Sequence, residues 1–268
     1  MRELPGPEGA VAGPRSRHSV SLLGCDVDAL TLEETVAKVD ELILAGKPAQ
    51  GFLTNADTML QLRDDPRLRT IASRCELVCA DGQSVVWAAR LLGRRLPERV
   101  AGPDLFDALL TLAASKAYSV YFLGAKPGIA EEAARNAMAL HPGLRVAGVH
   151  HGYFEIEDAT VVDAVRRAHP QILFVGMPSP RKEYWVSENL DYLAVPFALG
   201  VGGTFDLVAG VVARAPVWMQ RAGLEWLFRL YQEPRRMWKR YVIGNARFVA
   251  LVLRELCEQR RSKVFPDR

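Results

Sequence analysis

A glycine-rich turn, residues 200–206 (GVGGTFD), has the composition of a phosphate-binding loop. It follows an apolar run, residues 195–199, that is typical of a buried strand. Glycines at the carboxyl end of a strand allow positive φ and let a ligand phosphate approach backbone N–H groups. We therefore predict that Gly202, Gly203 and Asp206 contact a nucleotide or its phosphates.

Two other strand ends carry groups that suit acid–base chemistry. One apolar stretch runs into Thr54, Asn55 and Asp57, and the next runs into Asp81 and a glycine. Ligands of open parallel sheets bind just past the carboxyl ends of the strands, so these side chains are expected at one crevice. Asp81 has the position of a general base. Asn55 and Asp57 have a plainer alternative, since either would also cap the helix that follows.

Two later strand–helix junctions suit phosphate or sugar contacts. Gly124, Pro127 and Gly128 form a Gly-x-x-x-Gly turn after a strand, a geometry that binds phosphate at a helix N-terminus. The GxGxxG spacing of dinucleotide sites and the Gly-Lys-Ser/Thr ending of ATP sites are both missing, so neither site is predicted. Arg181 and Lys182 open a later helix, and either would reach a phosphate or a sugar.

Cationic side chains define a further candidate site and a distinct tail. Arg99 lies near Glu98 and Asp104; it would bind a phosphate or pair with one of them, and charge alone favours the pair. Residues 214–268 hold 13 Lys and Arg against 5 Asp and Glu, a net charge of +8, so residues 1–213 sum to −5 in a chain of net +3. Tryptophans and apolar stretches share this tail, a mixture that suits anionic lipid or a diphosphate.

Composition excludes several classes of protein. A chain of 268 residues, 49% hydrophobic and 24% charged, is long and apolar enough to fold. Its cysteines form no CxxC pair and its histidines lie at no metal-ligand spacing, so no metal site is predicted. No apolar run reaches the roughly 18 residues of a bilayer span. Residues 1–17 lack the apolar centre of a signal peptide and indicate a flexible arm, so we expect a cytoplasmic protein.

The elements that position these groups alternate regularly. Apolar strands and amphipathic helices follow one another from about residue 18 to residue 210, and a polar turn follows each strand. The helix from Thr31 is the best signalled, with Glu34 completing a capping box and Gly46 ending the helix. Fewer than eight such units indicate a Rossmann-like, doubly wound, mainly parallel α/β sheet and not a barrel. A single strand is expected at residues 18–23.

Taken together, the motifs resemble the bacterial WecB/TagA/CpsF glycosyltransferases over about residues 18–245. The resemblance rests on six motifs in order: Thr54-Asn55-Ala56-Asp57, Ala80-Asp81-Gly82, Arg99-Val100-x-Gly102-x-Asp104, Phe122-Leu123-Gly124-x-x-Pro127-Gly128, the turn 200–206, and Arg214-Ala215-Pro216 running into Leu224-Glu225-Trp226-Leu227-x-Arg229-Leu230-x-Gln232-Glu233-Pro234. It implies an inverting transfer from a UDP-sugar to a polyprenyl-diphosphate-linked saccharide, for a surface or secreted polysaccharide. It also implies that no metal is needed, and we expect no other cofactor.

The resemblance implies roles for individual residues. The family's proposed base corresponds to Asp81, its threonine near the donor sugar to Thr54, and its phosphate-linked arginine to Arg99. The C-terminal appendage is expected to close over the site and to donate arginines to the diphosphate; the candidates are Arg229, Arg236 and Arg240. Lys182 stands where many members have glutamine, so N-acetylmannosamine, glucose and a uronate sugar all remain candidate donors.

We therefore predict an arm at residues 1–17, a catalytic domain at 18–213 and a helical appendage at 214–268 that also docks on the cytoplasmic membrane face. A second copy of the chain is a further candidate partner. A non-catalytic, nucleotide-sugar-binding membrane scaffold is the alternative function, although it leaves Asp81 and Thr54 unexplained. A nucleic-acid partner is not expected, because the body is acidic and no nucleic-acid-binding signature is present.

Overall fold

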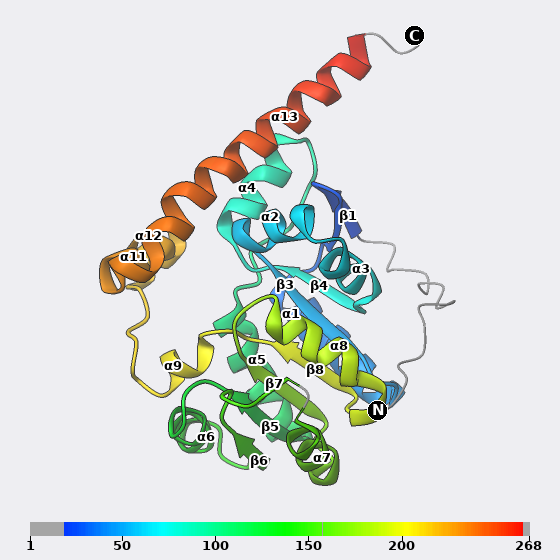
Figure 1. The fold of residues 1–268 in the computed structure, drawn as a ribbon, viewed down its shortest axis with the longest axis vertical. Coiled ribbons are helices and arrows are strands. Elements are labelled where there is room, and N and C mark those ends of the chain that lie inside the picture. Colours follow the sequence, from blue (N-terminus) through cyan, green and yellow to red (C-terminus); the bar gives the residue numbers. More distant parts are fainter. Residues whose placement is uncertain (1–18, 157, 265–268) are drawn as a thin grey trace.

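A parallel sheet of six strands forms the centre of the molecule (Figure 1). The computed structural model describes residues 19–156 and 158–264, so the predicted arm at residues 1–17 lies outside the described residues. The strands are β3 (Gln50–Thr54), β4 (Leu77–Ala80), β5 (Ser119–Gly124), β6 (Arg145–His150), β7 (Ile172–Gly176) and β8 (Phe197–Gly200). They pair in parallel in the order β4-β3-β8-β7-β5-β6. The predicted doubly wound α/β fold is confirmed.

Helices cover both faces of this sheet (Figure 1). One face packs against α1 (Leu32–Ala45), α5 (Gly102–Lys116) and α6 (Ile129–Leu140). The other packs against α2 (Ala56–Asp64), α3 (Pro66–Arg74), α4 (Gln83–Leu91), α7 (Ala159–Ala168) and α8 (Arg181–Leu193). Alternate residues of a strand serve opposite faces, as Phe122 and Leu123 of β5 do. A strand buried on both faces needs a continuous apolar run, which is the pattern that the sequence shows.

The helix predicted from Thr31 has the expected ends. The Thr31 side chain accepts the Glu34 N–H at 3.2 Å, and the Glu34 carboxylate accepts the Thr31 N–H at 2.8 Å. Gly46 ends α1 with φ of +65°, a left-handed conformation that glycine adopts at little cost. The capping box and the glycine stop are thus confirmed, and they set the bounds of a helix that packs on the sheet.

The first strand is part of a hairpin that the sequence reading missed. In place of one strand at 18–23, β1 (Ser19–Leu22) pairs antiparallel with β2 (Cys25–Asp28). Leu23 and Gly24 form the turn with φ of +53° and +81°, the positive values that match the twist of a two-residue hairpin. Leucine is seldom found in that conformation, so the sequence carries little signal for the turn.

The tail is helical, as predicted. After α9 (Thr204–Val208), which still belongs to the body, the tail comprises α10 (Val217–Arg221), α11 (Glu225–Gln232), α12 (Pro234–Trp238), a π-helix (Lys239–Ile243) and α13 (Gly244–Val264). Helix α13 crosses the body beside α2, where Phe248 and Val252 are buried, and its far end projects from the molecule (Figure 1). Ion pairs of Arg247 with Asp64 at 2.9 Å and of Glu255 with Arg94 at 2.6 Å flank this contact. Within the described ranges, no helix is long and apolar enough to cross a bilayer.

Asp65, the N-cap of α3, is expected to make stability depend on pH. Its carboxylate accepts the Tyr184 hydroxyl and, at 3.0 Å, the Leu68 N–H. These two bonds, Tyr184 first, hold the pKa of Asp65 below its ordinary value. A lowered folded-state pKa contributes stability that is complete above the unfolded pKa, about 3.9, and is lost as pH falls through the folded value.

Replacing Asp65 by Ala should lower the free energy of unfolding by about 1 kcal/mol at pH 7, the usual worth of a cap. Urea titrations at several pH values measure the effect. The difference between wild type and variant should begin to shrink below about pH 4, where the carboxylate of the unfolded chain takes up its proton, and should shrink further as pH falls through the lower folded pKa. Asp191→Ala, at an exposed position of α8, is the control. A difference that is the same at pH 2.5 and pH 7 would contradict the assignment.

Candidate active site

The turns after β3 and β4 meet at the carboxyl edge of the sheet. The N–H groups of Asp81 and Gly82 both donate to the Thr54 carbonyl, at 2.8 and 3.2 Å. A Cβ added to Gly82 would lie 3.0 Å from the Cβ of Asn55, so a side chain there would push the turns apart. The expected meeting of these two turns is confirmed, and it brings Asn55 and Asp81 to one place.

The Asp81 carboxylate is held in a fixed orientation. Its Oδ1 accepts the N–H of Gly102, the first residue of α5, at 2.6 Å, and the side chain is half-buried. A Cβ at Gly102 would lie at an ordinary contact distance of 3.5 Å from that oxygen but only 3.0 Å from Leu53, so the packing of Leu53 favours glycine here. The carboxylate is thus oriented by the protein and still partly open to solvent, as a general base has to be.

Thr54 and Asn55 both make structural hydrogen bonds at this edge of the sheet. Thr54 is fully buried, and its hydroxyl donates to the Cys79 carbonyl of β4 at 2.9 Å. Asn55 caps α2, with Oδ1 accepting the N–H groups of Asp57 and Thr58 at 3.1 and 3.2 Å. Asn55 therefore does cap the helix, and its contact with a substrate stays a prediction. Burial strongly raises the pKa of the neighbouring Cys79 thiol, which makes that group a poor nucleophile.

The turn after β5 contains two glycines, which the structure requires for different reasons. Gly124 is buried with φ of +143°, and a Cβ there would lie 2.5 Å from the backbone of Gly176, so close strand packing explains it. Pro127 and Gly128 are exposed, and Gly128, with φ of +86°, leads into α6. Of the predicted trio, Pro127 and Gly128 are therefore the two residues that are open to solvent.

The turn after β8 lies beneath an arginine of the tail. Gly202 has φ of +55° with open space on its Cβ side. A Cβ at Gly203 would lie 3.6 Å from Nη2 of Arg229 and 3.8 Å from Oδ2 of Asp206. Arg229, on α11, is thus brought to the glycine-rich turn from a part of the chain more than twenty residues away. The folded chain thus brings together two features that the sequence predicted separately, the glycine-rich turn and a cationic side chain of the tail.

Lys182 sits at the next strand end, in a buried ion pair. Lys182 and Glu183 are 7% and 4% exposed and pair with each other at the start of α8. The Lys182 stem covers Gly200, where a Cβ would lie 2.6 Å from Cε. Oε2 of Glu183 is buried without a hydrogen-bond partner. The positive charge of Lys182 is therefore already balanced by Glu183, without a carboxylate from the substrate.

Arg99 is paired, but not with the expected residues. Its Nη1 lies 3.0 Å from Oε2 of Glu225, on α11. The prediction of Glu98 or Asp104 as its partner is wrong, because both carboxylates are used elsewhere. Glu98 accepts the backbone N–H of Leu32 at 2.5 Å, and Asp104 pairs with Arg214. The partner comes from the tail, which local spacing does not reveal.

Comparison with known proteins decides the family. Residues 20–262 match the model of the glycosyl transferase WecG/TagA/CpsF family. The chain belongs to this family. It is therefore a glycosyltransferase, and the match covers the sheet, the turns described above and nearly all of the described tail.

Relatives from two genera share most of the length. An enzyme of Bacillus spizizenii (strain ATCC 23059 / NRRL B-14472 / W23) is 32% identical over 200 residues, which cover 75% of this chain and 77% of the relative. One of Staphylococcus aureus (strain MW2) is 27% identical over 244 residues, which cover 90% and 93%. Both are named N-acetylglucosaminyldiphosphoundecaprenol N-acetyl-beta-D-mannosaminyltransferase.

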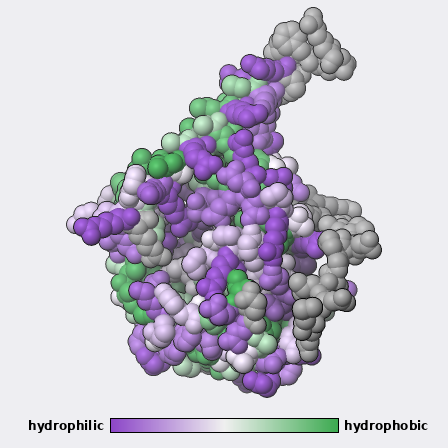
Figure 2. All heavy atoms as spheres, viewed as in Figure 1, coloured by the Kyte–Doolittle hydropathy of each residue, from purple (hydrophilic) through white to green (hydrophobic). Residues whose placement is uncertain are grey.

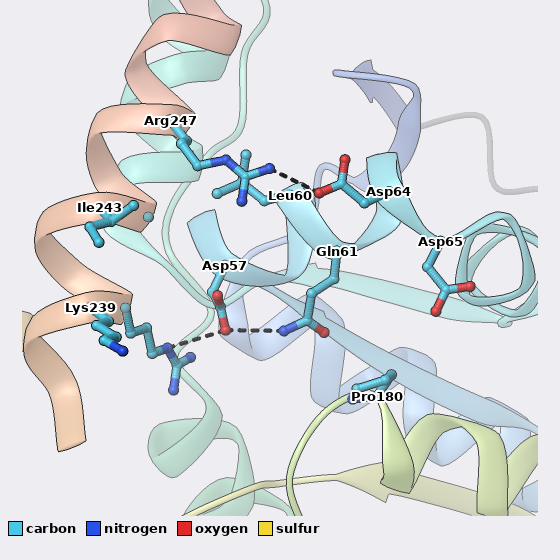
Figure 3. A pocket seen from close by; sticks show the side chains of 11 residues that line it. Asp57, Leu60, Gln61, Asp64, Asp65, Pro180, Lys239, Ile243 and Arg247 are labelled. Atoms are coloured by element: carbon cyan, nitrogen blue, oxygen red, sulfur yellow. Dashed lines mark hydrogen bonds and ion pairs between the residues drawn. The ribbon is translucent and has the colours of Figure 1, made fainter.

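A pocket of about 410 Å³ lies between α2 and the tail of the glycosyltransferase (Figure 3). Asp57 of α2 faces it; Oδ2 lies 3.3 Å from Nε of Arg240 and accepts from the Gln61 amide at 3.1 Å. Its other charged lining residues are Asp64, Asp65, Lys239 and Arg247. The predicted Arg240 thus lies beside the edge of the sheet that holds Asp81, while the side chain of Arg236 lies outside the described part of the structure.

Several residues of the pocket and of the contact between body and tail were not proposed as site residues from the sequence. Gln61, Lys239 and Arg247 line the pocket, and Glu225 and Arg214 join the body to the tail. The signal was present only as a motif, since Arg214 and Glu225 belong to the segment that carries the family resemblance. In the part of the chain that is described, no group of three or more His, Cys, Asp or Glu side chains is arranged to hold a metal ion.

Proposed function

We propose that this glycosyltransferase moves a sugar from a UDP-sugar to a polyprenyl-diphosphate-linked saccharide, with inversion at the anomeric carbon. The observation that carries the proposal is the Asp81 carboxylate, oriented by the Gly102 N–H at the carboxyl edge of the sheet. Cationic side chains of the body and tail gather at the same edge, as a diphosphate leaving group requires.

In the proposed reaction Asp81 is the base. It accepts the proton of the acceptor hydroxyl while that oxygen attacks the anomeric carbon from the side opposite to UDP. The bond from that carbon to the β-phosphate oxygen breaks, and UDP leaves with the electron pair. A single displacement of this kind inverts the configuration, and the proton on Asp81 passes to solvent afterwards.

Arginines stabilise the charge that develops on UDP. Arg229 lies at the glycine-rich turn after β8, and Arg99 precedes Val100, whose N–H donates to the Ala80 carbonyl at the end of β4. Both arginines are therefore close to the carboxyl edge of the sheet. A guanidinium offers several donors in a plane that matches phosphate oxygens. Arg236 and Arg240 remain candidates for the same task, and the exposed turn at Pro127 and Gly128 is a candidate contact for the nucleotide.

The relatives suggest both substrates. Their names describe transfer of N-acetylmannosamine to N-acetylglucosaminyl-diphospho-undecaprenol, and we propose an acceptor of this class for the present chain. The donor is proposed to be UDP-N-acetylmannosamine or a related UDP-sugar such as UDP-glucose. Lys182 is balanced by Glu183, so the lysine charge alone does not argue for a uronate donor.

We also place the reaction at the cytoplasmic membrane face. Trp238, Val242, Val249 and Leu253 of the tail are each about half exposed, and Figure 2 shows hydrophobic residues along one side of the projecting α13. The tail also carries many arginines and lysines. Exposed apolar side chains beside cations suit a surface of anionic lipid, where a lipid-linked acceptor is found.

The test is UDP release by the purified chain with a polyprenyl-diphosphate-N-acetylglucosamine analogue, across a panel of UDP-sugars and with EDTA present. We expect turnover with one donor and a product of inverted anomeric configuration by NMR. Turnover that stops with EDTA and returns with a divalent cation would contradict the metal-independent mechanism. Absence of turnover with every donor, from folded protein, would contradict the proposed substrates.

A further inference from the structure

Glu225 lies at the centre of a chain of charges that joins the tail to the catalytic edge. Its Oε2 is 3.0 Å from Nη1 of Arg99, and its Oε1 is 3.9 Å from Nε of Arg214. Arg214 in turn pairs with Asp104. The four side chains thus alternate in sign, and the two oxygens of one carboxylate face two different guanidiniums.

The link between Glu225 and Arg99 is shielded from water. The two side chains are 18% and 14% exposed, against 66% and 60% for the Arg254–Glu258 pair on α13. Exposed pairs contribute little because water and salt screen them, whereas removing one partner of a shielded pair leaves the other charge without compensation. Nε of Arg214 is buried without a hydrogen bond, so this guanidinium also depends on the nearby carboxylates.

The body end of this network holds the proposed base. Arg99 and Asp104 flank a short segment in which the Val100 N–H donates to the Ala80 carbonyl at 2.9 Å, and the Gly102 N–H donates to Asp81 at 2.6 Å. A shift of residues 99–104 would therefore move the hydrogen-bond donor that orients Asp81. Residues 99–104 are thus held by hydrogen bonds to the end of β4 and its following turn, and by ion pairs to the tail.

We propose that Glu225 is a positioning residue: it locks residues 99–104 to the tail and thereby orients both Arg99 and Asp81. The inference rests on the proposed function of those two residues. Glu225 engages Nη1 of Arg99, and a guanidinium carries five N–H donors, so the same arginine can hold a substrate phosphate. Undocking of the tail breaks this link and loosens the catalytic segment.

The experiment compares the full-length wild type with Glu225→Gln and Glu225→Asp, and with Glu258→Gln as the matched control. Hydrogen–deuterium exchange of residues 99–104 is measured without substrate, and kcat and KM are measured in the UDP-release assay. Glu225→Gln should speed exchange in residues 99–104 and lower kcat by about 10- to 100-fold, since small misplacements of catalytic groups are costly. Glu225→Asp, which keeps the charge, should recover part of the kcat, and Glu258→Gln should stay within about twofold of wild type.

Two results would overturn the proposal. Unchanged exchange in residues 99–104 of Glu225→Gln shows that Glu225 does not hold the segment, whatever the activity. Faster exchange with unchanged kcat and KM shows that the segment does not control the site. A wild type that is inactive on every donor counts against the proposed function instead, and the exchange comparison still decides whether Glu225 holds the segment. A melting temperature for each variant separates local loosening from global unfolding.

Discussion

Replacing Asp81 by Asn is expected to lower kcat by about 10²- to 10⁴-fold, the usual worth of a positioned general base. Asparagine has nearly the same shape, and its carbonyl oxygen can still accept the Gly102 N–H that Asp81 accepts at 2.6 Å. The turn should therefore keep its geometry while the group that takes the proton is lost. Initial rates of UDP release, with calorimetry for UDP affinity, measure the two effects separately, and UDP affinity should be largely unchanged.

The control for this variant is Asp28→Asn. Asp28 also presents a carboxylate to β4, because its Oδ2 accepts the Val78 N–H at 2.7 Å, but it comes from the hairpin and not from the active edge. It should keep wild-type kcat. If Asp81→Asn turns over as fast as wild type, Asp81 is not the base; if Asp28→Asn is equally impaired, the loss in both reflects damage to β4.

The sequence predicted that the candidate site residues lie at one edge of the sheet, because parallel strands impose it. Asp81, Asn55 and Gly203 each follow an apolar run by no more than a few residues, and all strands of such a sheet end on the same side. The meeting of the turns after β3 and β4 follows from their adjacency in the sheet. The local pattern of apolar runs and polar turns was therefore enough to predict most of the fold of the body and where its candidate site residues lie.

The contacts between the body and the tail could not be predicted from local sequence patterns. Arg99 was expected to pair with a neighbour in the chain, yet its partner Glu225 is 126 residues away. Nothing in spacing or charge distinguishes Glu225 from the other acids of the tail, because the choice depends on how α11 docks. Arg229 at Gly203 is a similar case, since only the folded tail brings the guanidinium to the turn.

Glycines show a subtler limit of sequence reading. Gly124 was interpreted as part of a phosphate-binding turn, and the structure provides another sufficient reason for it: the backbone of Gly176 lies where a side chain would be. Gly102 likewise has a packing reason, because a Cβ there would lie 3.0 Å from the side chain of Leu53. A glycine at a strand end thus indicates that another group comes close to the backbone there. Only the structure shows whether that group is a neighbouring strand, a side chain or a ligand.

Replacing Phe248 by Ala is expected to lower the free energy of unfolding by about 3–5 kcal/mol, the range for a large aromatic removed from a core. Phe248 is on α13, is 3% exposed and belongs to the buried cluster that also contains residues of α2, α3 and α4. The control is its neighbour Val249, which is 54% exposed; Val249→Ala should change stability by no more than about 0.5 kcal/mol. Urea unfolding followed by circular dichroism measures both.

This pair of variants also decides how the tail should be studied. Ala215, Met237, Phe248 and Val252 are all buried, so deleting residues 214–268 would strip apolar groups from the core and confound loss of catalysis with loss of stability. If Phe248→Ala unfolds in one transition at lower urea, the tail and body form one cooperative unit. If instead it keeps wild-type stability, α13 does not complete the core, and truncation becomes a clean test of the tail's part in catalysis.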